Sequence, residues 1–292
     1  MKKIFVVGCA RSGTTLVQKL FAAHNQVYTC KETHYFEHIR RSGKKGLLLP
    51  LDFLRLSPRK VRFAYRFIEA NNELRGTYDP RTIRTIRDAA QFFDHLMTTE
   101  ARLRGKSAWV EKTPPHLLHI PLIQRHIPAA QFVHVIRDGR DVVASLVDAG
   151  IKFPGSWWEQ YKNIEHAIQF YNQRLQKSLQ YCGQAAHIFV RYEDILADAE
   201  HIARCLYART GLPETDFVLD LKKTHHLVVR QDEGWKQEHP DKIQNTHLVK
   251  FRRLFDETEQ AQIERRVLKF PPQQENMLVQ NNCLKNRKPS NP

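Results

Sequence analysis

Short, near-continuous apolar runs recur along the chain and are separated by longer amphipathic stretches. The runs are rich in β-branched and aromatic residues, which is typical of strands buried on both faces of a sheet. They cover residues 4–7, 108–110, 131–136 and 186–190. Each run leads into a polar turn, so we predict four buried strands.

The stretches between these runs carry apolar residues at helical spacing. The last of them ends before Gly211, with Pro213 beyond, which is a helix stop signal. Strands that alternate with helices imply right-handed crossovers and a parallel sheet with helices on both faces. We therefore predict an α/β fold with helical insertions. The predicted helices cover residues 14–23, 88–104, 157–181 and 198–210.

The chain has 292 residues and no linker rich in Pro, Gly and Ser. We predict one domain over residues 1–270 and a weakly ordered tail over 271–292, which is rich in Gln, Asn, Pro and Lys. No segment approaches the roughly 18 apolar residues of a membrane helix. The apolar start breaks off at Arg11, too early for a secretory signal. We expect neither a transmembrane segment nor export.

The chain carries 46 Lys and Arg against 31 Asp and Glu, a net charge of +15. This excess favours a polyanionic ligand: a nucleotide, a sulfated or phosphorylated polymer, a nucleic acid or a membrane surface. The five cysteines are widely spaced and form no C-x-x-C. That pattern is not typical of a disulfide framework or a zinc site, and it indicates a reducing compartment.

The segment from Gly8 to Thr15, GCARSGTT, follows the first predicted strand and opens the first predicted helix. It matches the phosphate-binding pattern G-x-x-x-x-G-K-[ST] except that Thr14 replaces the lysine. Glycines let backbone N–H groups converge on an anion in front of a helix N-terminus. Arg11 supplies a cation inside the loop. We expect an oxyanion to bind here, but not as in an ATPase.

This P-loop-like segment resembles the 5′-phosphosulfate loop of sulfotransferases that use 3′-phosphoadenosine 5′-phosphosulfate (PAPS). The cytosolic enzymes have lysine at the position of Arg11, and the tyrosylprotein sulfotransferases have arginine. The resemblance extends over roughly residues 4–210. It implies a phosphosulfate site formed by Arg11, Ser12, Gly13, Thr14 and Thr15.

A second segment, VIRDGRDVVAS at residues 135–145, resembles the 3′-phosphate motif of this family. Arg137 at the strand end and Ser145 in the next helix take over the phosphate contacts there. Tyr192 in the sequence RYED resembles the family's tyrosine near the adenine, and the alternative is a tyrosine that anchors the strand end. The family's Arg-Lys-Gly closing loop is not found. Trp235 lies in the equivalent region, as a stacking surface or a core residue.

Two further segments resemble catalytic motifs of heparan sulfate 3-O-sulfotransferases. In KETHYF at residues 31–36, the resemblance assigns the general base to Glu32, with His34 as an active-site neighbour or second candidate. In VEKTP at residues 110–114, it places Lys112 at the bridging oxygen of the transferring group. Glu111 is the rival base if Glu32 points away.

Together these resemblances imply a sulfotransferase that moves a sulfuryl group from PAPS to a hydroxyl or amine acceptor. We expect no metal, because Thr14 replaces the P-loop lysine and no magnesium-binding carboxylate is evident beside the loop, and we expect a cytoplasmic location, because no membrane anchor is found. The acceptor is expected to be a carbohydrate or a small molecule, with an acidic acceptor as a further option, and no nucleic acid partner is expected. Two alternatives stay open. One is a nucleotide-dependent kinase or NTPase on the same fold, and the other is a non-catalytic module that binds an anionic polymer. No motif specifies the acceptor or an oligomeric state.

Overall fold

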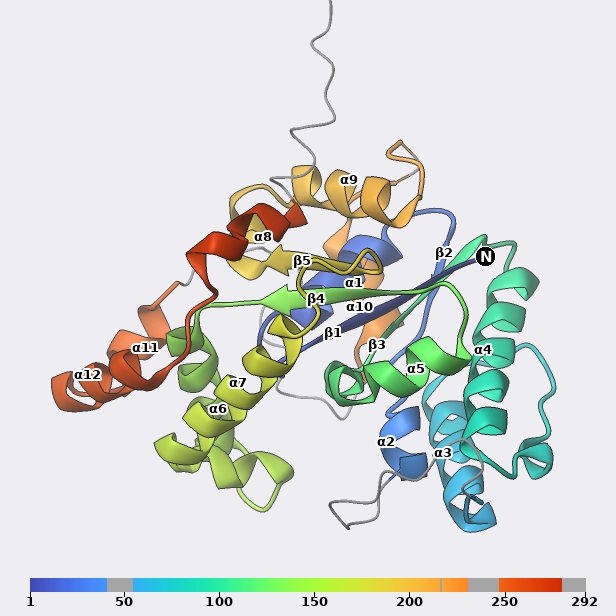
Figure 1. The fold of residues 1–292 in the computed structure, drawn as a ribbon, viewed down its shortest axis with the longest axis horizontal. Helices are drawn as coiled ribbons and strands as arrows, with labels where there is room; N and C mark the ends of the chain where they lie inside the picture. Colours follow the sequence, from blue (N-terminus) through green and yellow to red (C-terminus); the bar gives the residue numbers. More distant parts are fainter. Residues whose placement is uncertain (41–54, 216, 231–246, 280–292) are drawn as a thin grey trace, which may run out of the picture.

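The computed structural model describes residues 1–40, 55–215, 217–230 and 247–279. Within these ranges, a five-stranded sheet with the strand order β2-β3-β1-β4-β5 forms the centre of the molecule (Figure 1). All neighbouring strands are parallel. The strands are β1 (Lys2–Gly8), β2 (Val27–Thr29), β3 (Ala108–Lys112), β4 (Ala130–Ile136) and β5 (His187–Arg191).

Side chains of β1 alternate between two hydrophobic layers because successive residues of a strand point to opposite faces. Ile4 and Val6 belong to one buried cluster, and Phe5 and Val7 belong to the other. Helices therefore cover both faces of the sheet. The Ile4 face is covered by α1 (Thr14–Ala22), α8 (Tyr192–Ala197), α9 (Ala199–Thr210) and α10 (Leu221–Val228).

The Phe5 face carries the larger helical layer, which includes the segments inserted between β2 and β3. In Figure 1 the helices α2, α3 and α4 lie on the right and α11 and α12 on the left. This layer consists of α2 (Tyr35–Arg40), α3 (Pro58–Asn71), α4 (Ile86–Leu103), α5 (Ile120–His126), α6 (Gly139–Lys152), α7 (Ile164–Leu179), α11 (Val249–Leu254) and α12 (Glu257–Arg266). The short 3-10 helices η2 (Pro80–Thr82), η3 (Pro114–His119) and η4 (Trp157–Lys162) join these elements.

The predicted α/β fold with a parallel, P-loop-like sheet is confirmed, and all four predicted strands are present. One strand was not predicted, and one predicted helix is wrong. The strand β2 has only three residues, too few to give a periodic signal. The predicted helix over 157–181 is divided into η4 and α7 at Asn163, whose extended backbone ends the first and whose side chain caps the second.

The beginning of the expected tail packs against the sheet. Residues Pro272–Met277 form the 3-10 helix η6, and Leu278 pairs with Phe189 of β5 in a parallel bridge. Leu278 and Val279 are buried on opposite faces of the sheet. Residues 280–292 and Trp235 lie outside the described residues. Within the described part of the chain, no helix has the length and apolarity needed to cross a bilayer.

Two histidines lie side by side in the core between β4 and β5. The Nε2 atom of His134 is 2.9 Å from Nδ1 of His187, and Nε2 of His187 is 3.0 Å from the side-chain nitrogen of Gln124. Burial disfavours the charged imidazolium and lowers the pKa of both side chains, that of His187 to about 4. Both rings are therefore neutral in the native state at pH 7.

These histidines should make the fold sensitive to acid. The unfolded chain binds protons near pH 6.5 that the native rings cannot accept, so the free energy of unfolding should fall as the pH drops from about 6.5 to about 4. The slope should reach about 1.4 kcal/mol per pH unit for each histidine. Urea denaturation at several pH values measures it. The variant His187→Gln should show a shallower decline, and parallel curves for variant and parent would contradict this assignment.

Candidate functional site

The loop between β1 and α1 has the backbone shape of an anion-binding nest. Arg11 and Gly13 both have positive φ angles, 71° and 92°. This conformation costs a non-glycine residue such as Arg11 about 1–2 kcal/mol. The helix α1 begins at Thr14, and no side chain caps its first turn within the described residues. Its first N–H groups thus remain directed at the space in front of the loop, where the helix dipole favours an anion.

Tyr192 packs directly on this loop. A Cβ atom at Gly13 would lie 2.2 Å from Cδ2 of Tyr192, so only glycine fits there. The guanidinium carbon of Arg137 lies 4.4 Å from the centre of the same ring. Tyr192 therefore lies between the loop and Arg137, at the first residue of α8. These contacts explain a tyrosine just after β5 by local packing alone, as in the alternative of a tyrosine that anchors the strand end.

Arg137 and Ser145 meet the loop at the carboxyl end of β4. The Nε atom of Arg11 donates a hydrogen bond to Oγ of Ser145 over 2.9 Å. Nη1 of Arg137 donates to the backbone carbonyl of Arg11 over 3.1 Å. The structure thus brings together the predicted residues of the two phosphate motifs, although they lie more than a hundred positions apart in the chain.

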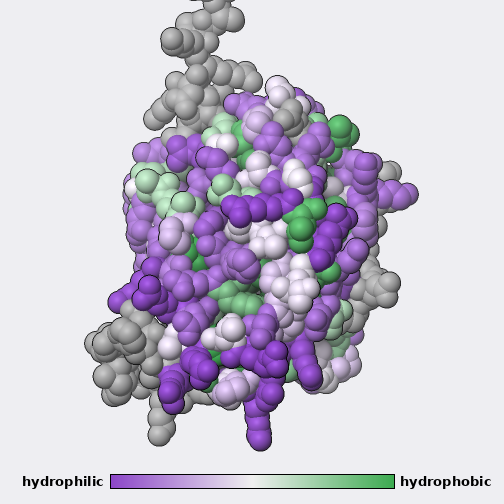
Figure 2. All heavy atoms as spheres, turned by 90° about the vertical axis from the view of Figure 1, so that its right-hand side faces the viewer, coloured by the Kyte–Doolittle hydropathy of each residue, from purple (hydrophilic) through white to green (hydrophobic). Residues whose placement is uncertain are grey.

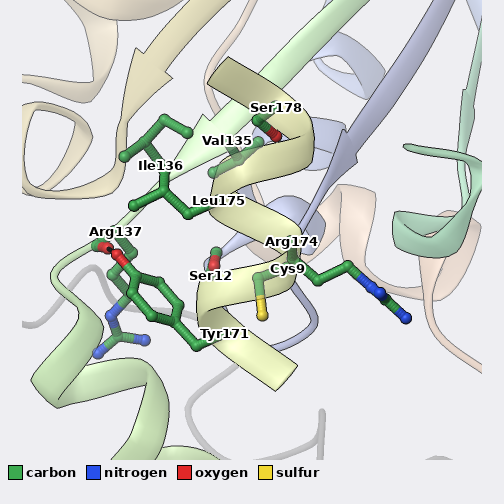
Figure 3. A pocket seen from close by; sticks show the side chains of 9 residues that line it. All are labelled: Cys9, Ser12, Val135, Ile136, Arg137, Tyr171, Arg174, Leu175 and Ser178. Atoms are coloured by element: carbon green, nitrogen blue, oxygen red, sulfur yellow. Dashed lines mark hydrogen bonds between the residues drawn. The ribbon is translucent and has the colours of Figure 1, made fainter. Parts of the chain in front are cut away.

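Ser12 points away from this site, into the space behind the loop. Its side chain is 1% exposed and lines a void of about 10 Å³ below α7, together with Cys9 and Tyr171 (Figure 3). Its backbone N–H donates to the carbonyl of Cys9 over 3.2 Å. Of the five loop residues predicted to hold the phosphosulfate, Ser12 is therefore the one that does not line the space in front of the loop.

A cleft of about 1120 Å³ opens in front of the loop. It runs from the strand ends of β1 and β4 across to η3, η4 and α7. Its walls combine the loop with the predicted catalytic segment and with aromatic residues. The predicted residues that line it are Arg11, Gly13, Thr14, Thr15, Glu32, His34, Arg137 and Ser145. Lys112 and Glu111 lie below its floor, both fully buried.

A continuous set of charged groups connects the loop to the far wall of the cleft. The Nζ atom of Lys112 donates to Oγ1 of Thr15 over 3.2 Å and also binds Oε1 of Glu32. The other Glu32 oxygen lies 3.0 Å from Nε2 of His34, and Nδ1 of His34 lies 2.7 Å from Oε2 of Glu37. Glu32 also lines the cleft, so its carboxylate adjoins the space that a ligand would occupy.

His34 is an imidazolium at neutral pH. Burial disfavours its charge, but hydrogen bonds to Glu32 and Glu37 outweigh burial and raise the pKa of His34 to about 9. A protonated ring cannot accept a proton, so this geometry disfavours His34 as a base. Glu37 was not among the predicted site residues. Its signal in the sequence is its position three residues after His34, in the first turn of α2.

Glu111 has a different environment from Glu32. It is fully buried and accepts hydrogen bonds from Thr33, Thr113 and His116. Burial alone would raise the pKa of Glu111, but the neighbouring His116 and these hydrogen bonds lower it. Because it holds the segment after β2 against β3 and does not reach the cleft, its position supports a structural role.

The opposite wall of the cleft is aromatic, and sequence reasoning assigned it no function. Trp157, Trp158 and Phe170 line it, and Trp157 is 56% exposed. The Trp157 ring lies 5.8 Å from that of Phe170, and the guanidinium of Arg174 lies 4.6 Å above the Phe170 ring. The two adjacent tryptophans are the only sequence signal for this wall. The apolar periodicity of 157–181 is equally compatible with their packing in the core.

One group of potential metal ligands gathers within the described residues. Ligand atoms of Asp141, Glu193 and His247 lie within 4.8 Å of one another. They already have protein partners: Asp141 bonds to the His247 ring and to the Leu248 N–H, and Glu193 accepts from the Asp138 N–H. The cluster attaches residues 247–248 to α6. His225 and His226 belong to no such group in the described part of the chain.

The class of the protein follows from comparison with known proteins. The model of the sulfotransferase family matches residues 3–216. Protein-tyrosine sulfotransferase 1 of Danio rerio is 25% identical over 221 residues, which cover 75% of this chain and 56% of the relative. The protein-tyrosine sulfotransferase of Drosophila melanogaster is 22% identical over 228 residues, covering 75% and 40%. The chain spans between 28% and 61% of the length of the curated relatives that it matches.

Among solved structures, the chain resembles the sulfotransferase domain of the Synechococcus PCC 7002 olefin synthase. The identity is 16%, the TM-score is 0.56, and the alignment covers 92% of this chain and 95% of that domain. This similarity concerns the fold. Because the family model matches most of its length, the chain belongs to the sulfotransferase family, and the predicted membership is confirmed.

The charge state of His34 can be measured directly. An NMR titration of the histidine rings should show His34 with an apparent pKa near 9, because two carboxylates stabilise its cation. The variant Glu37→Gln should lower that value, since it removes one of them. The signal is identified by its loss in His34→Asn. A value near 6.5 in the parent protein would contradict the described pairing.

Proposed function

We propose that the protein is an enzyme that transfers a sulfuryl group from PAPS to a hydroxyl or amine acceptor and releases adenosine 3′,5′-bisphosphate. The observation that carries this proposal is the position of the loop. Its positive-φ residues and the first turn of α1 face the same cleft as Glu32, and buried Lys112 joins the two. An anion site and a carboxylate thus adjoin one reaction space.

The donor side of the cleft lies at the ends of β1 and β4. Backbone N–H groups at Gly13, Thr14 and Thr15 would bind the 5′-phosphosulfate, with Arg11 as the local cation. Arg137 and Ser145 would bind the 3′-phosphate, and they already contact Arg11. Tyr192, stacked on Arg137, would hold that guanidinium in place next to the adenosine.

In the transfer, the acceptor oxygen attacks sulfur as the bond between sulfur and the bridging phosphate oxygen breaks. Glu32 takes the proton of the acceptor hydroxyl, and the bridging oxygen keeps the electron pair. Lys112, already bonded to Thr15 of the loop, stabilises the charge that develops on that oxygen. Positioning and charge stabilisation would supply most of the acceleration, as in phosphoryl transfer.

We propose no metal in this reaction. Arg11, Lys112 and the N-terminus of α1 provide positive charge, and a sulfuryl group needs less of it than a phosphoryl group does. The acceptor would be a carbohydrate or small molecule whose ring packs on Trp157, Trp158 and Phe170. A cytoplasmic location is consistent with the four described cysteines, which are all free thiols.

The 3′-phosphate assignment predicts nucleotide selectivity. Adenosine 3′,5′-bisphosphate should bind at least about tenfold more tightly than adenosine 5′-monophosphate, since a hydrogen bond to a charged group contributes about 1.5–3 kcal/mol. Arg137→Ala should remove most of this difference, whereas Arg140→Ala, whose side chain pairs with Asp138 and Glu264, should keep it. Calorimetry measures both. Equal affinities in the parent protein would refute the assignment, and preference for ATP would indicate a kinase or NTPase.

The base assignment predicts that Glu32→Gln lowers turnover by about 10²–10⁴, because it keeps the shape and removes the proton acceptor. Affinity for adenosine 3′,5′-bisphosphate should change little. Turnover with a panel of sugar and phenol acceptors and direct nucleotide binding measure the two effects. Glu111→Gln is the matched control and should retain turnover per folded molecule. An inactive Glu111→Gln beside an active Glu32→Gln would move the base to the end of β3.

A further inference from the structure

The outer face of α3 carries a line of arginines. Arg59, Arg62 and Arg66 recur at helical spacing and are all exposed. They extend over about 10 Å of helix, at 1.5 Å of rise per residue. Arg55 and Arg84 are also exposed, and the chain around residue 55, just before α3, pairs with the chain around residue 85 in an antiparallel bridge. These five residues are termed the α3 arginine patch below.

No acidic partner accounts for these arginines within the described residues. None of the guanidinium groups of Arg59, Arg62 and Arg66 forms a hydrogen bond or ion pair there. Elsewhere on the surface, exposed arginines such as Arg81 and Arg266 pair with Asp79 and Glu165. Figure 2 looks onto this side of the molecule, and hydrophilic side chains gather along its lower edge, over α3.

The patch adjoins the cleft through two phenylalanines of the same helix. Phe63, which is 57% exposed, and Phe67 both pack against the ring of His38, with centres 4.9 Å apart in each case. Phe67 also contacts His34 and lies 5.2 Å below the guanidinium of Arg230. His34, His38 and Arg230 line the cleft. A ligand that lies along α3 therefore reaches the wall of the cleft that contains the proposed base.

We propose that the α3 arginine patch docks an acidic polysaccharide and guides one of its hydroxyl groups to Glu32. This inference rests on the proposed function, because it names the class of acceptor for that site. Guanidinium groups present fixed pairs of N–H donors that match sulfate and carboxylate groups. Their linear arrangement on a convex helix suits a chain-like ligand better than a planar membrane surface.

The chemistry of the cleft selects among chain-like polyanions. A polysaccharide carries anionic groups and hydroxyl acceptors in every repeat, and the aromatic wall at Trp157 and Phe170 offers flat faces for sugar rings. An extended acidic peptide directs successive side chains to opposite sides, so half of them would point away from one line of arginines. Single-stranded nucleic acid requires several stacking platforms, and Phe63 is the one exposed aromatic residue of α3.

The test compares two triple variants of equal charge. Arg59→Gln/Arg62→Gln/Arg66→Gln removes the centre of the patch, and Arg252→Gln/Arg253→Gln/Arg265→Gln removes three exposed arginines from α11 and α12 at the far side of the molecule (Figure 1). Binding of heparin, a sulfated polysaccharide, is measured with saturating adenosine 3′,5′-bisphosphate present. The patch variant should bind heparin at least about tenfold more weakly and show a salt slope smaller by about two to three, whereas the control should keep both.

Several results would overturn the proposal. Equal losses in the two triple variants would show that net charge alone acts. Polyglutamate or anionic phosphatidylglycerol vesicles that bind as tightly as heparin would assign the patch to a peptide or a membrane. Nucleotide affinity is measured on the same samples and should be unchanged. If the parent binds heparin through the patch but binds no nucleotide, the docking surface stands and the proposed transfer reaction fails.

Discussion

The buried ammonium group of Lys112 is the constraint on which the site depends. The side chain is fully buried, and an uncompensated charge there would cost several kcal/mol. Glu32 and Thr15 compensate it, and they come from the chain after β2 and from the first turn of α1. One side chain therefore fixes the relative positions of three strand ends. The loop, the carboxylate and the floor of the cleft cannot shift independently while this pair is formed.

The order of the strands explains why Glu32 and Lys112 lie in the same site as Arg137. β1 lies in the middle of the sheet, with β3 and β2 on one side and β4 and β5 on the other. The residues after β2 and at the end of β3 supply Glu32 and Lys112, and the end of β4 supplies Arg137. In open parallel sheets, ligands bind beyond the carboxyl ends of the strands where the connections diverge. The loop after β1 occupies that position.

Sequence reasoning located the features whose residues are contiguous in the chain. The loop from Gly8 to Thr15 is continuous, so its pattern survives in the sequence, and the buried strands give short, near-continuous apolar runs. It did not reveal that Ser12 faces inward, since that depends on the packing of α7 over the loop. It also missed Glu37 and the aromatic wall around Trp157. Glu37 is connected to Glu32 only through His34, and the aromatic wall depends on the break of the helix at Asn163.

The two carboxylate oxygens of Glu32 contact two different cations. Lys112 and the His34 cation both form ion pairs with the Glu32 carboxylate. In the proposed reaction, Lys112 would move toward the leaving oxygen as charge develops there, and this movement would free one Glu32 oxygen as the acceptor proton is released. The negative charge of Glu37 compensates the positive charge of His34, so this wall of the cleft carries no unpaired charge at His34. Under the proposed mechanism, the single ammonium group of Lys112 would therefore link stabilisation of the leaving group to proton transfer at Glu32.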